Sequence, residues 1–202
     1  LVVFADDLTA TFFAGQGREM LSTMESLIKS GESRLLIVQN INYKEFSLPV
    51  SPIAKYIYVS DYIGSTNLSS NIIESWLKKI GSQNSLTIPG DGLEEVSLIG
   101  ERDLSSLLAK AILHPNTKVG EELYLGNPTP ISLLNLAYIV RTNLPVKVSL
   151  NFDTDSTINL WPYNSKVLEN SLEKLDYQLI DFPEELLKKY LKSHAETLPI
   201  QV

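Results

Sequence analysis

The chain has 202 residues, 44% of them apolar, with a net charge of −7, two histidines and no cysteine. This length and composition predict one folded domain with a hydrophobic core, or one domain with a small additional lobe, and they argue against disorder. They exclude disulfides, cysteine nucleophiles and thiolate metal sites, disfavour nucleic acids and anionic membranes as partners, and fit a cytoplasmic protein without a membrane-spanning helix.

Apolar patterns along the chain predict strands that alternate with helices. The predicted strands, in chain order, are Leu1–Phe4, Leu35–Val38, Tyr56–Val59, Leu123–Leu125 and Val146–Leu150. The predicted helices are Thr9–Ser30, Ser65–Ile80, Asp103–Leu113, Ile131–Thr142, Lys166–Leu175 and Glu184–Leu191. This alternation is typical of an α/β fold with a mostly parallel sheet. Because the chain opens directly on a core strand, we expect that further residues precede it.

Three residues are expected to mark helix ends. Gly31 and Gly81 follow the first two predicted helices, and glycine readily adopts the left-handed conformation that ends a helix. Asp103 stands just before an apolar helical run, which is typical of an N-cap. We therefore expect Asp103 to cap its helix and to take no part in catalysis, so that its replacement by asparagine has little effect on stability.

The second half of the chain carries several short strings in a fixed order. They are the turn Gly90-Asp91-Gly92, the helix start at Asp103, the turn Gly126-Asn127-Pro128, the string Trp161-Pro162-Tyr163-Asn164-Ser165 and a final amphipathic helix. In this order the strings resemble the substrate-side half of the extended short-chain dehydrogenases/reductases, which include sugar-nucleotide epimerases, dehydratases and reductases. The tail is most similar to the dehydrorhamnose reductase branch.

The resemblance implies a Rossmann-like, mostly parallel sheet with helices on both faces and a small C-terminal substrate-type lobe. Residues 1–120 would form the Rossmann-like part without its N-terminal strands, and residues 121–202 the lobe and the C-terminal helices. The first strand would match the family's fourth, with Ala5 beneath the nicotinamide ribose. NAD or NADP is then expected only if the missing part supplies the glycine-rich turn that binds phosphate. The string Gly15-Gln16-Gly17 lies in a helical pattern and lacks the third glycine.

The family's catalytic residues are a serine or threonine after the fifth strand and a Tyr-x-x-x-Lys pair on the next helix, where the lysine lowers the tyrosine pKa. No such pair occurs in this sequence. Tyr62 is the best positional match, with Thr66 in the place of the lysine and Asn40 in the place of the serine. A second alignment makes Ser60 the catalytic serine. The resemblance thus implies a degenerate active site with catalytic Tyr62 and Ser60 and with cofactor contacts from Ala5, Asn40 and Thr66.

Two functions remain open at this point. The first is a divergent NAD(P)-dependent sugar-nucleotide epimerase, dehydratase or reductase-like protein, and the second is a non-catalytic regulatory or binding subunit with the same fold. The expected partners are a nucleotide-sugar-like small molecule or a protein. A homodimer is expected through the helices Thr9–Ser30 and Ser65–Ile80, because the first is apolar on more than one side. Asp153 and Asp155 are expected to be solvated acids, since no calcium loop follows them.

Overall fold

The computed structural model describes residues 2–5, 35–41, 54–64, 68–69, 71–113, 121–155 and 163–195. Its helices are α2 (Asn71–Gln83), α3 (Glu101–Leu113), α4 (Leu133–Asn143), α5 (Ser165–Lys174) and α6 (Pro183–His194). Its strands are β1 (Val2–Ala5), β2 (Leu35–Asn40), β3 (Ala54–Val59), β4 (Asp61–Ile63), β5 (Leu68–Ser69), β6 (Ser85–Pro89), β7 (Glu95–Val96), β8 (Leu98–Gly100), β9 (Glu122–Leu125), β10 (Ile131–Ser132) and β11 (Ser149–Asp153). The predicted helix Thr9–Ser30 lies outside the described residues. None of the described helices has the length and apolarity to cross a bilayer.

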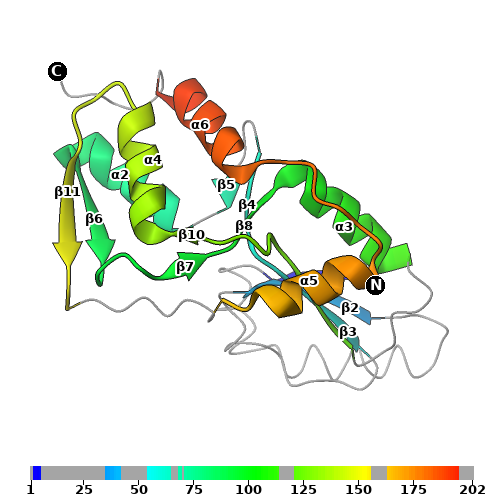
Figure 1. Ribbon diagram of the computed structural model, residues 1–202. Coiled ribbons are helices and arrows are strands. Elements are labelled where there is room, and N and C mark those ends of the chain that lie inside the picture. Colours follow the sequence, from blue (N-terminus) through cyan, green and yellow to red (C-terminus); the bar gives the residue numbers. More distant parts are fainter. Residues whose placement is uncertain are drawn as a thin grey trace.

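The largest sheet has four parallel strands in the order β1-β2-β3-β9, and Figure 1 labels its two central strands, β2 and β3. Its register aligns Val38 with Ile57 and Ile57 with Leu123, so apolar side chains of neighbouring strands share one face. Two further strand pairs, β4 with β8 and β6 with β11, are also parallel. The predicted α/β fold with parallel strands is therefore confirmed.

One hydrophobic core lies between this sheet and the helices α3 and α5. Ile57 and Leu125 of the sheet and Leu107 of α3 are each 0% exposed. Burial of one such aliphatic side chain contributes about 1.5–3 kcal/mol to folding. α5 also protects the edge of β9, where the Tyr124 backbone N–H donates to the Ser171 hydroxyl at 3.0 Å, and a sheet edge needs such cover.

A second core gathers α2, β6, α4 and α6, which stand together on the left and at the top of Figure 1. Ile73, Leu86 and Leu187 are 0% exposed within it. The indole nitrogen of Trp76 donates to the carbonyl oxygen of Thr87 at 2.8 Å and fastens α2 to β6. Each of the two cores takes residues from both sides of position 120.

The second helix lies later in the chain than predicted. It begins at Asn71 instead of Ser65, and it runs through Gly81 to Gln83. The prediction that Gly81 ends this helix is wrong. The chain leaves the helix at Asn84, whose φ is 50°, because asparagine tolerates the left-handed conformation better than most residues.

Gly92→Ala and Gly81→Ala are expected to change stability in opposite directions. Gly92 has φ +76°, and an added Cβ would lie 3.0 Å from Cγ2 of Ile88, so alanine there should lower the free energy of unfolding by about 1–2 kcal/mol. Gly81 lies inside α2, where alanine should raise it by roughly 0.5–1 kcal/mol. Urea denaturation of the two variants measures both changes, and two shifts of the same sign would contradict this account.

Candidate functional site

The parallel strands β2, β3 and β9 end at one edge of the large sheet, and polar residues gather there. β2 ends at Asn40, Ser60 and Asp61 follow β3, and Gly126 follows β9. In open α/β sheets, ligands bind outside the carboxyl ends of the strands. These four residues, which we call the carboxyl edge, form the candidate site.

A hydrogen bond between two strands holds the carboxyl edge together. The side-chain amide of Asn40 donates from Nδ2 to Oδ1 of Asp61 at 3.0 Å. Asp61 is buried, with 9% of its surface exposed, and a buried carboxylate requires such donors. The bond also fixes the orientation of the Asn40 amide at the place where a ligand of the sheet would lie.

Ser60 lies deep in the carboxyl edge. It is 1% exposed, its backbone N–H donates to the carbonyl oxygen of Leu125 at 2.8 Å, and its hydroxyl lies 3.4 Å from the carbonyl oxygen of Asp61. In this geometry Ser60 fastens β3 to β9. Its catalytic role stays a prediction.

The turn after β9 needs a glycine at its first position. A Cβ on Gly126 would lie 2.7 Å from Oγ of Ser97 and 2.9 Å from Oγ of Ser60, closer than packed atoms approach. The same Ser97 hydroxyl accepts from the backbone N–H of Asn127 at 2.9 Å and donates to its carbonyl oxygen at 3.1 Å. Ser97 therefore ties this turn to the segment between β7 and β8.

The sequence predicts Tyr62 at the start of a helix, but the structure places it in a strand. It is the middle residue of β4, paired with Ser69 of β5 and Ile99 of β8, and its half-buried side chain packs against the core under α3. The helix α2 begins only at Asn71. Asn40 is the last residue of β2, whereas Tyr62 comes after the end of β3. The two residues therefore lie after different strands of the large sheet.

The predicted cofactor contacts are only partly within the described residues. Ala5 ends β1, and its backbone is in register with Gln39, next to Asn40. Ala5 and Asn40 thus stand at neighbouring strand ends of the same edge. Thr66 lies outside the described residues, and its predicted role stays a prediction.

Asp103 is not an N-cap. α3 begins two residues earlier, at Glu101, and the buried carboxylate of Asp103, which is 1% exposed, turns toward the segment between α5 and α6. It accepts hydrogen bonds from the backbone N–H groups of Ile180 at 3.0 Å and Asp181 at 2.7 Å and from the Tyr177 hydroxyl at 2.9 Å. Burial is the main cause that raises the pKa of Tyr177.

A row of buried tyrosines occupies the face of the sheet opposite to the core under α3. Tyr56 and Tyr58 of β3 have ring centroids 6.5 Å apart, and Tyr58 and Tyr124 of β9 have centroids 5.0 Å apart. The Tyr124 hydroxyl donates to Glu122 at 2.5 Å. Burial, with Glu122 in addition, raises the pKa of Tyr124. The Tyr124 phenol therefore remains protonated at neutral pH.

Tyr163 links the predicted substrate-side string to the turn after β9. Its hydroxyl donates to the carbonyl oxygen of Pro128. Burial, and then the charges of Glu95 and Glu169, raise the pKa of Tyr163 to about 12. Tyr163 is thus a neutral hydrogen-bond donor to a backbone group, while its neighbour Trp161 lies outside the described residues.

Two residues of this region, Asp61 in the carboxyl edge and Ser97 beside it, are not predicted from the sequence. Asp61 directly follows Ser60, and an acid at the end of a buried strand is a signal that points to it. Ser97 lies between two very short strands, and nothing in its local pattern distinguishes it. Within the described residues no group of acids and histidines is arranged to hold a metal ion, and Asp153 and Asp155 are exposed.

No family model and no curated protein matches this sequence. Solved structures do match. dTDP-glucose 4,6-dehydratase from Bacillus anthracis, in complex with NAD, has a TM-score of 0.64 and 16% identity over 87% of this chain and 66% of that chain. RMD from Pseudomonas aeruginosa, complexed with NADPH, has a TM-score of 0.61 and 12% identity over 88% and 71%. UDP-glucuronic acid 4-epimerase from Bacillus cereus, with UDP-glucuronic acid and NAD, has a TM-score of 0.56 and 14% identity over 80% and 62%.

These matches establish the class of fold. The chain has the fold of the extended short-chain dehydrogenases/reductases, among them NAD-dependent sugar-nucleotide epimerases and dehydratases, and its sequence is divergent from theirs. It spans 66% of the length of the dehydratase and 62% of that of the epimerase. The predicted resemblance is confirmed at the level of the fold.

Proposed function

We propose that this chain is a divergent NAD(P)-dependent sugar-nucleotide epimerase, dehydratase or reductase-like protein with a degenerate active site. The observation that carries the proposal is the carboxyl edge, where Asn40 and Asp61 place polar side chains at the strand ends of a fold shared with such enzymes. Amide and carboxylate groups are suited to the hydroxyls of a sugar, because they accept and donate hydrogen bonds in fixed directions.

The residues at the strand ends of the large sheet fit only part of a dinucleotide. Asn40, Asp61 and the backbone at Ala5 fit the hydroxyls of a ribose, and a dinucleotide bound there would supply hydride chemistry. The pyrophosphate needs a glycine-rich turn at a helix N-terminus, and no G-x-G-x-x-G or G-x-x-G-x-x-G string occurs in the sequence. We propose that NAD or NADP binds only when a further polypeptide segment provides this turn beside β1, an outer strand of the described sheet.

Nucleotide-sugar binding tests the proposal without a cofactor. UDP-glucose and dTDP-glucose should each show saturable binding to the purified chain by calorimetry or saturation-transfer NMR. Asn40→Ala should weaken this binding by about 3- to 10-fold, because it removes one hydrogen bond. Asn151→Ala, on the exposed strand β11, is the matched control and should bind as the parent does. Absence of binding at millimolar nucleotide sugar would overturn the proposal.

The second candidate is a non-catalytic regulatory or binding subunit. One observation favours it, namely that Tyr62 lies in a strand and that no Tyr-x-x-x-Lys pair occurs in the sequence. On this alternative the carboxyl edge binds a nucleotide sugar as a signal or as a structural ligand. The proposed roles of Tyr62 and Ser60 would then be those of packing residues.

The predicted homodimer and the division into two parts are kept as proposals. Of the two helices in the predicted interface, α2 directs its apolar side into its own core and exposes Ser75, Lys78 and Lys79. A dimer would then depend mainly on Thr9–Ser30, and light scattering at micromolar concentration measures it. Both cores contain residues from the two predicted parts. We therefore propose that the division concerns function, with residues 1–120 as the Rossmann-like part and residues 121–202 as the substrate-side part. The cytoplasmic location stays a prediction.

A further inference from the structure

A cleft of about 720 Å³ lies on the side of the molecule where the chain passes between its two cores. One wall is the turn after β9, which leads from the sheet to α4, and the other is the segment 177–182, which leads from α5 to α6. In Figure 1 this segment runs beside α3. Ligands and partners favour such junctions, because two packed bodies meet there and leave a hollow.

The second wall of the cleft is fastened to α3 at both ends. At one end Asp103 accepts from the backbone N–H groups of Ile180 and Asp181. At the other end Lys110, two turns along the same helix, donates to the carbonyl oxygens of Leu175 at 3.2 Å and Asp176 at 2.6 Å. These hydrogen bonds restrain the wall before anything binds, and such preorganisation lowers the entropic cost of binding.

The cleft combines an apolar floor with an acidic rim. Ile131, Leu172 and Leu179 line it, and Asp181, Glu184 and Glu185 bring carboxylates, whereas none of its lining residues within the described chain is basic. The acidic rim would repel an anion such as a nucleotide sugar, and none of the four residues of the carboxyl edge lines the cleft.

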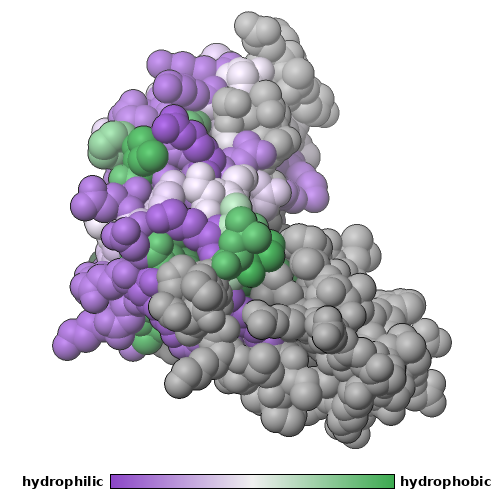
Figure 2. Space-filling view, turned by 90° about the vertical axis from the view of Figure 1, so that its right-hand side faces the viewer, coloured by the Kyte–Doolittle hydropathy of each residue, from purple (hydrophilic) through white to green (hydrophobic). Residues whose placement is uncertain are grey.

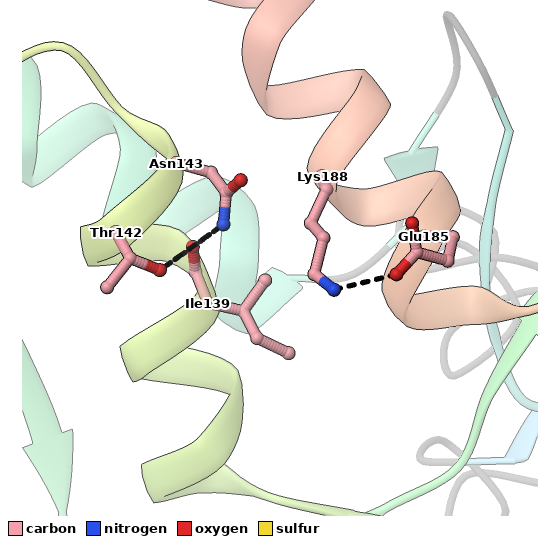
Figure 3. Close-up of polar contacts among 5 residues, drawn as sticks. All are labelled: Ile139, Thr142, Asn143, Glu185 and Lys188. Atoms are coloured by element: carbon pink, nitrogen blue, oxygen red, sulfur yellow. Dashed lines mark hydrogen bonds and ion pairs between the residues drawn. The ribbon is translucent and has the colours of Figure 1, made fainter.

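One of the three carboxylates of the rim is partly neutralised. Glu185 accepts a hydrogen bond from Lys188 at 2.7 Å, one turn along α6, and Figure 3 shows this pair on the helix opposite the last turn of α4. The Lys188 side chain lowers the pKa of Glu185. Asp181 and Glu184 carry the remaining negative charge of the rim.

Two large apolar side chains project from the fastened wall. Phe182 is 75% exposed and Ile180 is 52% exposed. Figure 2 shows one face of the molecule, on which hydrophobic patches are separated by mostly hydrophilic surface. An exposed aromatic side chain on a restrained segment beside a cleft is typical of a hot spot in a protein–protein interface.

We propose that this cleft is a docking site for an extended peptide segment of a partner protein that carries lysine or arginine next to apolar side chains. The apolar residues of the peptide would lie on the floor and against Phe182, and its cations would face Asp181 and Glu184. Charge complementarity selects this partner, because the rim is acidic and the described lining brings no cation. The whole chain has a net charge of −7, which opposes docking of a second copy.

Fluorescence anisotropy with two labelled hexapeptides tests the proposal. One peptide alternates leucine with lysine and the other alternates leucine with glutamate. The lysine peptide should bind saturably and more weakly as salt rises, and the glutamate peptide should not bind. Phe182→Ser and Glu184→Lys should each weaken binding at least about tenfold. Phe152→Ser and Asp155→Lys, which change an exposed aromatic and an exposed acid away from the cleft, are matched controls and should bind within about twofold of the parent.

Three results would overturn the proposal. The first is equal binding of the two peptides, and the second is unchanged binding by Phe182→Ser and Glu184→Lys together. The third is self-association of the parent chain that Phe182→Ser abolishes, because the exposed pair Lys78 and Lys79 of a second copy would then be the occupant. Both cleft residues are exposed, so the variants should keep the parent's circular dichroism and thermal midpoint.

Discussion

Asp103→Ala should lower the free energy of unfolding by about 3–5 kcal/mol. The substitution removes a buried acceptor that satisfies three donors, two of them backbone N–H groups. The three donors are the Tyr177 hydroxyl and the backbone N–H groups of Ile180 and Asp181. In the variant they stay partly buried beside α3 and have lost their acceptor. The segment that forms one wall of the cleft would then be fastened to α3 mainly through Lys110.

Asp103→Asn separates the two interpretations of this residue. An N-cap asparagine replaces aspartate with little change in stability. An acceptor of three hydrogen bonds does not tolerate the exchange, since the new amide nitrogen faces a donor, and the expected loss is about 2 kcal/mol. Urea denaturation measures the loss, with the exposed Asp155→Asn as the control. A change below about 0.5 kcal/mol would restore the N-cap interpretation.

The sequence predicts the alternation of strands and helices because long apolar patterns depend on local spacing. α3, α4, α5 and α6 all lie close to their predicted bounds, and the largest difference is the end of α6, which continues past Leu191 to His194. The strands of the large sheet are also found, since each is a short apolar run between polar residues. Where a helix or strand packs against a core on one side, its periodicity is visible in the chain itself.

The remainder of the fold depends on contacts that no local pattern contains. β4, β5, β7 and β10 have two or three residues each, too few for a period. β4 pairs with β8, and β7 pairs with β10, so these pairings join strands that are far apart in the chain. β11 begins at Ser149 and so lies later than the predicted strand, with most of its side chains exposed, because its pairing with β6 decides its position. Asp103 and its acceptor role illustrate the same limit, since its partners follow it by 74 to 78 residues.

The candidate site was predicted in part. The sequence predicts Asn40 and Ser60 as strand-end residues, and both do lie at the carboxyl ends of parallel strands. The amphipathic pattern that follows Tyr62 predicts a helix start at this residue, yet the chain first forms β4 and β5. The short strand β4 is stabilised by β8, which comes much later in the chain, and such pairing is invisible in the pattern of neighbouring residues.

We expect this chain to give no oxidoreductase turnover with nucleotide sugars and NAD or NADP. Positioned acid–base groups contribute about 10²–10⁴-fold to such reactions, and the lysine that would activate a tyrosine is absent from the sequence. The measurement is the absorbance of the reduced nicotinamide over time, with UDP-glucose or dTDP-glucose as substrate. Steady formation or consumption of NADH or NADPH, abolished by Tyr62→Phe, would show that the site is active.

Thr66→Lys should not create this turnover either. In an α-helix, residues four apart share one face, and this is how a tyrosine and a lysine act together. Tyr62 lies in β4, which ends at Ile63, and α2 begins only at Asn71, so Tyr62 is not part of a helix that could present it beside a lysine. The variant should therefore fail to give the gain of about 10²–10⁴-fold that a correctly placed lysine provides. A rate that rises in Thr66→Lys and disappears again in the double variant with Tyr62→Phe would show that Tyr62 is a catalytic residue after all.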